Sequence, residues 1–280
     1  MRLSTVDKIT SAAGLLIILV LIVVAILAPV VAPYDPTLGS LGDRLKPPVW
    51  EKGGSPAHLL GTDLLGRDTL SRVIFGARTS LAVAVVAILV AGTLGSAVGI
   101  LAGYLGGWLD TLLMRSADLA FSFPAILLAM VLAVVFGASF YNIIFVISLV
   151  LWAEYARMAR AETLKVKEMD YVALAKVAGV SQFQIMLRHI FPNVASSLIV
   201  LATLQVGVVI IMESSLSFLG VGVPPPNPAW GSMIAEGRSY VVTAWWLSLV
   251  PGVAILVTVL SFNLLGDALT ELLSPERAAG

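Results

Sequence analysis

Long uncharged apolar runs are the feature that most restricts how this chain can fold. The first of them, residues 10–32, contains no charged residue, and comparable runs recur along the sequence. A helix needs about 20 mostly apolar residues to cross about 30 Å of hydrocarbon. The chain is 59% hydrophobic and only 12% charged, whereas soluble domains are about 25% charged. We therefore predict an all-α integral membrane protein.

Six apolar runs predict six transmembrane helices with both termini in the cytoplasm. Arg2 and Lys8 precede the first run, which is too long for a signal-peptide core, so we expect a retained helix. The segment Pro275 to Arg277 returns to the cytoplasm after the last run. The fourth run continues past its end as a cytoplasmic helix. The expected spans are residues 10–32, 79–104, 112–136, 143–157, 194–219 and 247–265.

The spans divide the chain into three parts. Residues 1–32 form the cytoplasmic N-terminus and first helix, and residues 33–78 form an extracytoplasmic loop. Residues 79–280 form a five-helix core, which contains one cytoplasmic loop at 158–193.

Composition excludes several kinds of site. The chain has no cysteine, so it has no disulfide framework, thiol nucleophile or Cys-ligated metal. Its net charge is zero and no basic tract is present, which argues against nucleic acid as a partner. His58 and His189 fall on opposite sides of the membrane in this topology, so no metal site is expected. No G-x-x-x-x-G-K-S/T phosphate loop occurs, so any energy from nucleotide must come from another chain.

One polar stretch, Glu154 to Asn193, interrupts the apolar runs. It holds six of the seventeen Lys and Arg residues, so the positive-inside rule puts it in the cytoplasm. Glu154, Arg157 and Arg160 recur every three residues within it. This spacing puts them on one helical face and predicts an interfacial charge cluster.

The same stretch predicts a short helix, a sharp turn and a second helix. Asp170 is suited to cap the first helix, and Gly179 to end it in the left-handed conformation. Ser181 and Gln184 have the capping-box spacing at the start of the second helix. Pro192 is expected to interrupt the chain near the next membrane entry.

Small residues keep the first of these helices slim. Ala173, Ala175 and Ala178 would let the groove of another protein approach the backbone closely. The alternative interpretation is a connector whose small residues pack only against its own membrane helices. Spacing alone gives the two interpretations equal weight.

The second span carries a seam of small residues that recur every four positions. Residues at this spacing stack along one face and let a neighbouring helix approach at backbone distance. We expect the seam to pack within the transmembrane bundle in preference to facing a translocation path. It consists of Ala91, Gly95, Gly99, Gly103 and Gly107.

Two carboxylates fall inside predicted spans, where an ionised group normally faces protein or water. Asp118 lies three residues beyond Arg115, so a local ion pair is the simpler interpretation. Glu213 lies near the outer end of the fifth span. It is expected to line a wet cavity or to pair with a partner subunit.

The predicted outer surface contains two polar or aromatic groups of residues. Asp63, Arg67, Asp68 and Arg72 are interpreted as a solvated, locally paired helix face in preference to a substrate contact. Trp and Tyr gather at membrane interfaces. An outer aromatic belt is therefore expected from Trp230, Tyr240, Trp245 and Trp246.

The cytoplasmic stretch DYVALAKVAGVSQFQIMLRHIFPN, residues 170–193, resembles the EAA loop of ABC importer permeases. That pattern is Glu-Ala-Ala, three residues, Gly, nine residues, then Ile-x-Leu-Pro. Gly179 and Pro192 fall at its Gly and Pro, and Ala175 at its second Ala. The sequence departs from the pattern at Ala173, Leu174, His189 and Phe191.

Further segments strengthen this resemblance, which covers nearly the whole chain. HLLGTDLLGRDTLSRVIFGARTSL, residues 58–81, is similar to a segment typical of the C-type subunit in dipeptide, oligopeptide and nickel permeases. PPNPAWGSM, residues 225–233, and FNLLGDAL, residues 262–269, look most like the dipeptide branch. The paired Gly-Thr-Asp and Gly-Arg-Asp motifs are more specific than the EAA loop.

The resemblance implies a type I ABC importer permease fold with a cytoplasmic coupling helix. It implies no catalytic residue and no cofactor on this chain, because ATP and magnesium would be held by a separate ATPase. The surface groove of that ATPase would receive residues 171–179. The coupling residues implied are Asp170, Tyr171, Ala173, Ala175, Gly179 and Pro192.

The same resemblance implies the remaining partners and the location. A second, homologous permease and one or two ATPase subunits would complete the transporter in the cytoplasmic (inner) membrane of a prokaryote. An extracytoplasmic binding protein would deliver dipeptides or short oligopeptides. Nickel or another small solute carried by the same family is the alternative substrate.

Two other classes of function are weighed against this one. An ion-coupled secondary transporter would use Asp118, Glu154 and Glu213, but these are scattered near membrane boundaries without an inverted repeat. A membrane-embedded serine protease would use the turn Gly137 to Ser139. A serine nucleophile needs a base within hydrogen-bond reach, and neither histidine lies on a membrane helix facing that turn.

Overall fold

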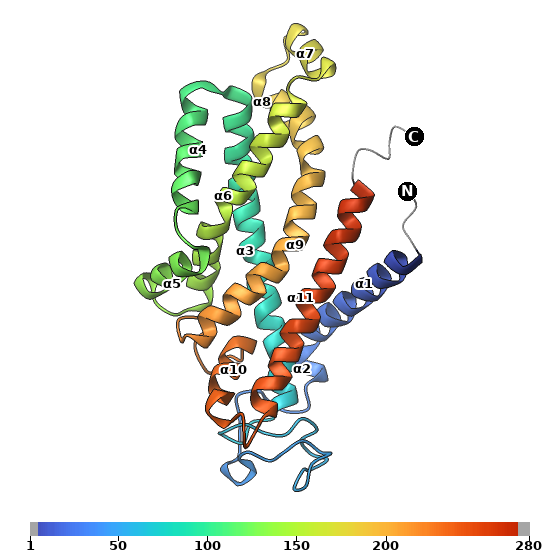
Figure 1. The fold of residues 1–280 in the computed structure, drawn as a ribbon, viewed down its shortest axis with the longest axis vertical. Helices are drawn as coiled ribbons and strands as arrows, with labels where there is room; N and C mark the ends of the chain where they lie inside the picture. Colours follow the sequence, from blue (N-terminus) through green and yellow to red (C-terminus); the bar gives the residue numbers. More distant parts are fainter. Residues whose placement is uncertain (1–4, 274–280) are drawn as a thin grey trace.

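The computed structural model describes residues 5–273. Apart from one isolated β-bridge between Thr62 and Asp68, every element of regular secondary structure in this range is a helix. Figure 1 shows α3, α4, α6, α9 and α11 running roughly along the long axis of the molecule. Arg2, the side chain of Lys8 and the segment Pro275 to Arg277 lie outside what is described. The elements are α1 (Thr5–Ile26), α2 (Ala28–Val31), η1 (Leu41–Asp43), α3 (Thr69–Leu105), α4 (Gly107–Phe121), α5 (Ala125–Phe136), α6 (Phe140–Val166), α7 (Asp170–Val177), α8 (Gln182–Ile185), η2 (Met186–Ile190), α9 (Phe191–Phe218), α10 (Trp230–Gly237), η3 (Arg238–Tyr240) and α11 (Trp246–Leu273).

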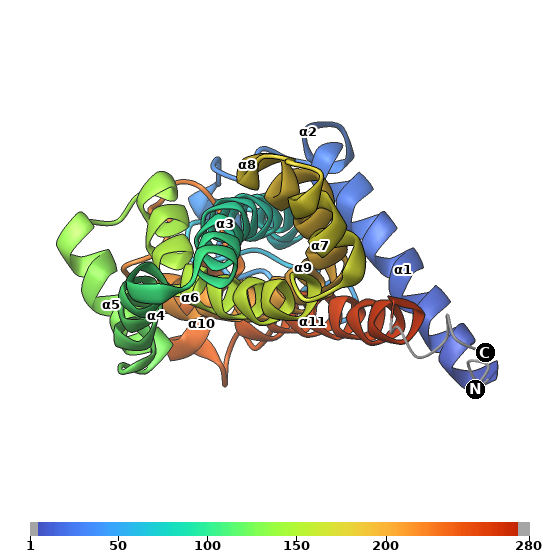
Figure 2. The same ribbon diagram turned by 90° about the horizontal axis from the view of Figure 1, so that it is seen from above.

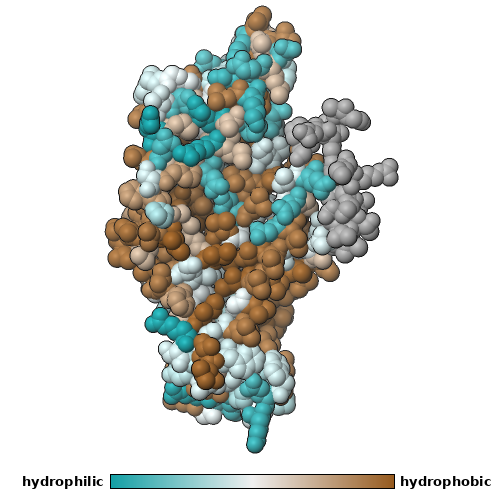
Figure 3. All heavy atoms as spheres, in the orientation of Figure 1, coloured by the Kyte–Doolittle hydropathy of each residue, from teal (hydrophilic) through white to brown (hydrophobic). Residues whose placement is uncertain are grey.

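Within residues 5–273, four helical runs are long and apolar enough to cross a membrane. They are α3, α6, α11 and the run Gln182–Phe218, which is formed by α8, η2 and α9. In Figure 3 the hydrophobic side chains form a broad band across the middle of the molecule, with hydrophilic side chains at both ends. The fold is therefore all-helical with several membrane-crossing helices, as predicted from the apolar runs.

The first predicted span, residues 10–32, is not one continuous helix. Its apolar helical part in α1, Thr10–Ile26, is shorter than the four spanning runs, and the short helix α2 follows with Pro29 in its first turn. Proline is accepted there because the first N–H groups of a helix have no partner within the helix. By length and composition the described helices give four spans, or five when α4 and α5 count as one.

The third predicted span, residues 112–136, is formed by two helices with a sharp bend between them. α4 ends at Phe121 and α5 begins at Ala125, and the two helices meet at 90°. Pro124 is the residue that precedes α5, with extended backbone at φ −55° and ψ 126°. Proline has no N–H for the helical ladder and restricts the residue before it, so the helix stops and restarts here.

Helix α3 packs most extensively on α6, along its glycine seam. A Cβ at Gly95 would lie 2.2 Å from the carbonyl oxygen of Trp152, and one at Gly99 would lie 2.2 Å from that of Ala156. At Gly103 the nearest atom, 2.9 Å away, is Cβ of Thr163. Only hydrogen fits at the first two positions, so the helices touch through their backbones. Figure 2 shows α3, α6, α9 and α11 arranged side by side along the molecule.

The end opposite α7 is closed by the loop between α2 and α3 together with α10 (Figure 1). Trp230 and Trp246, expected in an outer aromatic belt, are instead buried there. The indole N–H of Trp230 donates to the carbonyl of Val73 at 3.0 Å, and that of Trp246 donates to the carbonyl of Thr62 at 3.1 Å. These two rings hold the outer loop, α3 and α10 together, so the belt prediction was wrong for them.

Candidate functional site

The polar stretch that was predicted to be cytoplasmic folds into α7, a tight turn and α8, which together project from one end of the bundle (Figure 1). Gly179 has φ +77°, the left-handed conformation predicted for it. Its N–H donates to the carbonyl of Lys176, and the N–H of Val180 donates to that of Ala175, both at 3.1 Å. This pair of bonds is the Schellman ending of a helix. Ser181 then caps α8 by accepting from the N–H of Gln184.

Two expectations about this stretch need correction. The N-cap of α7 is Met169, and Asp170 is the first helical residue. Pro192 does not interrupt the chain, because it lies in the first turn of α9 and the helical run continues through it. The π-helical segment η2 comes immediately before, and the N–H of Phe191 donates to the carbonyl of Met186, five residues back. This shift of the hydrogen-bond ladder accommodates the proline.

Helix α7 presents an apolar face outward. Leu174 and Val177 are 68% and 87% exposed, and Tyr171 is also exposed on the same side. The opposite side, with Val172 and Ala175, is buried against the bundle. Exposed apolar side chains three residues apart on one helix form a surface suited to another protein.

Of the six coupling residues singled out from the sequence, the structure brings four together on α7. Asp170, Tyr171 and Ala173 lie on its exposed part, and Ala175 on its buried side. Gly179 follows in the turn, whereas Pro192 lies apart at the start of α9.

Polar and aromatic contacts join this region to the C-terminal end of α3, and sequence reasoning missed them. Lys167 Nζ donates to the carbonyl of Gly103 at 2.9 Å. Lys176 Nζ lies 5.6 Å from the centre of the Tyr104 ring. The residues concerned are more than sixty positions apart, so no local spacing signals these contacts.

The predicted charge cluster on α6 is not one cluster. Arg157 and Arg160 face α4, where they bind Asp118 at 2.6 Å and Asp110 at 2.5 and 2.6 Å. Glu154 faces α9, where it accepts a hydrogen bond from the side-chain amide of Gln205. The two arginines therefore join α6 to α4, while the glutamate joins α6 to α9.

Asp118 has a nearer partner than the one expected. Arg115, three residues before it, lies 3.8 Å away, whereas Arg157 on α6 lies 2.6 Å away. The guanidinium of Arg157 also lies 4.0 Å from the centre of the Phe121 ring. Asp118 therefore pairs mainly with α6, and only weakly with Arg115 of its own helix α4.

At the opposite end, Asp63, Arg67, Arg72 and Glu236 form a group that we call the outer polar network. The expectation of a solvated helix face was wrong, because the first three side chains are buried. Arg67 Nε donates to Asp63 at 2.6 Å. Both arginines also bind Glu236 of α10, Arg67 at 3.0 Å and Arg72 at 2.6 and 3.1 Å.

The outer polar network is held in place by its neighbours. Asp63 accepts from the backbone N–H groups of Leu65 and Arg67 at 2.8 and 2.9 Å, and Arg72 also donates to it. Asp68 accepts from Ser71 N at 2.8 Å and so caps α3, while it contacts His58 Nδ1 at 3.0 Å. The network thereby fixes the loop to α3 and α10.

An ion pair in the more exposed part of the same loop perturbs an acid group. The side chain of Lys46 donates to Asp43, and this hydrogen bond holds the pKa of the carboxyl below its usual range. The side chains of Lys46 and Asp43 are partly exposed, so the pair contributes little to stability.

Glu213 on α9 is fully buried, so the expectation of a wet cavity was wrong. Its carboxyl accepts from Ser217 at 2.7 Å and from Ser80 of α3 at 3.1 Å. The hydroxyl of Ser217 also accepts from the N–H of Val223 in the loop that follows α9. Glu213 therefore joins α3, α9 and this loop from within the bundle.

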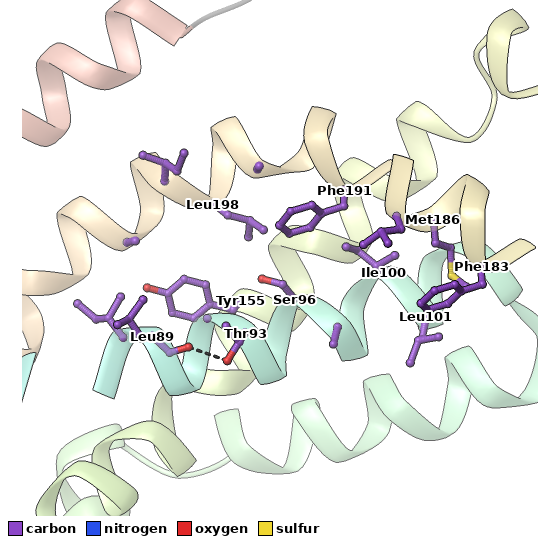
Figure 4. Close-up of a pocket in the computed structure, with 17 residues that line it drawn as sticks. Leu89, Thr93, Ser96, Ile100, Leu101, Tyr155, Phe183, Met186, Phe191 and Leu198 are labelled. Carbon is purple, nitrogen blue, oxygen red and sulfur yellow. Dashed lines mark hydrogen bonds between the residues drawn. The ribbon is translucent and has the colours of Figure 1, made fainter. Parts of the chain in front are cut away.

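A groove of about 660 Å³ opens between α3, α6 and the run from α8 to α9. Figure 4 shows Tyr155 and Ser96 among apolar side chains that include Phe183 and Phe191. Its lining contains no charged residue. Because a buried charge without a partner is costly, the groove suits apolar groups better than the charged ends of a peptide.

The described residues contain no group of three or more His, Asp or Glu side chains that could hold a metal ion. Ser139, considered as a nucleophile, is the N-cap of α6 and accepts from the N–H of Asn142 at 3.2 Å. His189 packs near the Tyr171 ring, with centroids 6.2 Å apart, and His58 contacts Asp68. These side chains have structural partners.

Residues 95–278 match the family model described as binding-protein-dependent transport system inner membrane component. Residues 10–48 match the N-terminal TM domain of oligopeptide transport permease C.

Several curated relatives match over nearly their entire length. The dipeptide transport system permease protein DppC of Haemophilus influenzae is 40% identical over 94% of this chain and 89% of that protein. The glutathione transport system permease protein GsiD of Pectobacterium atrosepticum is 41% identical over 95% of this chain and 86% of that protein. The probable D,D-dipeptide transport system permease protein DdpC of Escherichia coli K12 is 40% identical over 93% of this chain and 85% of that protein.

Proposed function

The chain belongs to the family of binding-protein-dependent transport system inner membrane components, and from this premise we propose that it is the permease subunit of an ATP-driven peptide importer. It is a multi-pass protein of the bacterial cytoplasmic membrane. The observation that carries the proposal is the match to dipeptide permeases at 40% identity over 94% of the chain.

The substrate class is short peptides. Relatives at 40–41% identity are named as permeases for dipeptides and for glutathione, itself a small peptide. Delivery by an extracytoplasmic binding protein agrees with the name of the family. Since the match does not separate dipeptides from glutathione, the peptide that the co-purified binding protein retains is the observation that distinguishes them.

The topology that fits this function has six spans and both termini in the cytoplasm. The apolar helix α1 and the bent pair α4 and α5 each supply one span in this proposal, beside the four longer runs. Residues 1–32 then comprise the N-terminus and first span, 33–78 the extracytoplasmic loop, and 79–280 the transport core with its coupling loop at 158–193. The apolar band in Figure 3 is the part that lies in lipid.

An ATPase subunit docks on α7. The exposed Leu174 and Val177 provide an apolar contact surface, and Tyr171 flanks them. ATP and magnesium belong to that subunit. One or two ATPases and a second, homologous permease complete the assembly, and the peptide passes between the two permeases.

Movement of α7 is transmitted through two long helices. α6 ends three residues before α7 begins, and α8 leads without a break into α9. Because α6 contacts α3 through the backbone at Gly95 and Gly99, a displacement of α6 carries α3 with it. When the ATPase closes on ATP, the displacement of α7 is therefore transmitted to the outer end of the permease by rigid helices.

Purification from the native membrane tests this proposal. The tagged chain is solubilised in mild detergent, and all co-purifying proteins are identified by mass spectrometry. We expect a second permease, an ABC ATPase and a binding protein that retains a short peptide. Recovery of the chain alone, in a form that still moves peptide after reconstitution without ATPase, would contradict the proposal and favour an ion-coupled transporter.

A further inference from the structure

Two polar side-chain atoms at the outer end of α3 are buried without a hydrogen-bond partner in the described structure. They are Nε of Arg72 and Oγ1 of Thr69. The residues are 2% and 1% exposed, so neither atom reaches bulk solvent. Leaving such groups unpaired costs about 1–3 kcal/mol each, and native proteins rarely accept that cost.

Both residues line one small cavity of about 10 Å³. Asp63 and Glu236 of the outer polar network line it as well. Apolar side chains form the rest of the wall, with Met233 from α10 and Leu247 from α11 among them. A cavity holds one water when it offers about 10–15 Å³ and two to four polar partners.

We propose that this cavity binds a single ordered water molecule. The water accepts a hydrogen bond from Arg72 Nε and donates one to the hydroxyl oxygen of Thr69. Its second hydrogen is directed to Glu236, whose Oε1 accepts only from Arg72 Nη2 among the described contacts. The water thereby satisfies both of the unpaired atoms.

The charges around the cavity favour water over an ion. Arg67 and Arg72 balance Asp63 and Glu236. A cation would lie against a guanidinium, and an anion would lie against two carboxylates, so either ion meets like charge at contact distance. A neutral molecule that both donates and accepts suits these surroundings.

The water completes a joint between four segments. The lining residues come from the loop before α3, from the first turns of α3, from α10 and from α11. Thr69 Oγ1 and Arg72 Nε are one helical turn apart on α3, so the water reinforces the helix start where the ion pairs converge.

A high-resolution map of the complete transporter in lipid nanodiscs tests the proposal, with samples prepared in standard buffer and in buffer free of sodium and chloride. Density within hydrogen-bond distance of both atoms is expected in each. Thr69→Ser keeps the hydroxyl and should keep the density. Thr69→Val has nearly the same shape without the hydroxyl and should lose it.

The proposal has clear contrary outcomes. Absence of density in the unaltered protein, in a map that shows other buried waters, would overturn it. Density that disappears in the ion-free buffer would identify an ion in place of water. Hydrogen exchange supplies a second readout. The backbone amides of residues 61–64 should exchange faster in Thr69→Val than in Thr69→Ser, and equal rates would show that no water links this loop to α3.

Discussion

Replacement of Gly179 by alanine isolates the backbone geometry of the coupling turn. Gly179 has φ +77°, and a Cβ added there would meet no atom within 4 Å. Alanine therefore clashes with nothing, and its whole effect comes from the left-handed conformation. The two Schellman bonds that end α7 depend on this conformation.

The expected size follows from that cost. An L-residue pays about 1–2 kcal/mol in the left-handed region, which lowers the ratio of ordered to disordered turn by about 5–30-fold. Helix α7 has only 8 residues, too few to be stable without its packing and ending. Valine at the same position is β-branched and pays more, so Gly179→Val should abolish import while membrane insertion is kept.

The assay compares ATPase retention and labelled dipeptide uptake at equal amounts of membrane-inserted protein. Gly179→Ala should lower both by up to the same 5–30-fold factor. Gly220→Ala is the matched control, because Gly220 has φ +84° and equally open surroundings in the loop after α9. Gly220→Ala has the same backbone cost in a loop distant from α7, so the ATPase should still co-purify with this variant. Normal retention in Gly179→Ala, or equal loss in both variants, would refute the reasoning.

Three further predictions concern stability in nanodiscs, measured by thermal unfolding. Gly99→Ala places a Cβ 2.2 Å from a backbone oxygen and should lower the free energy of unfolding by about 1–3 kcal/mol or more. Gly92→Ala is the control and should be tolerated, because the nearest atom to its Cβ is 3.5 Å away. Equal losses of stability in the two variants would contradict the packing argument. Arg72→Met removes one of the two guanidinium partners of Asp63 and Glu236, so that only Arg67 still pairs with them. Breaking this buried network should cost about 3–5 kcal/mol, so an unchanged midpoint would show that the outer polar network is dispensable. Arg160→Gln breaks a partly exposed pair with Asp110 and should cost only about 0.2–1 kcal/mol; a large loss would mean that this pair bears on the fold.

Features with a local cause could be predicted from the sequence. The apolar runs predicted membrane helices because uncharged apolar segments of this length are more stable in the hydrocarbon of a bilayer than in water. Gly179 was expected in the left-handed conformation because it follows a short helix, and its φ of +77° agrees. The i,i+4 spacing of Asp63 and Arg67 likewise allowed their local ion pair.

Features with a distant cause could not be predicted. Glu236 lies 164 residues from Arg72, and only the folded chain brings them together. Trp230 has the composition of an interfacial residue, yet its burial depends on the carbonyl of Val73 and on the space above Gly76. Pro124 was visible in the sequence, but proline is tolerated within some membrane helices, so the 90° bend became apparent only from the structure.

The backbone contact between α3 and α6 also limits how this pair of helices can change over evolutionary time. A methyl group at Gly95 or Gly99 would overlap a carbonyl oxygen that cannot move without its helix. Compensation would require separating the helices along their length, which no single substitution achieves. Sequence drift is thereby confined to the sides of α3 turned away from this contact, where an exposed residue such as Val85 can be exchanged for other apolar residues at little cost.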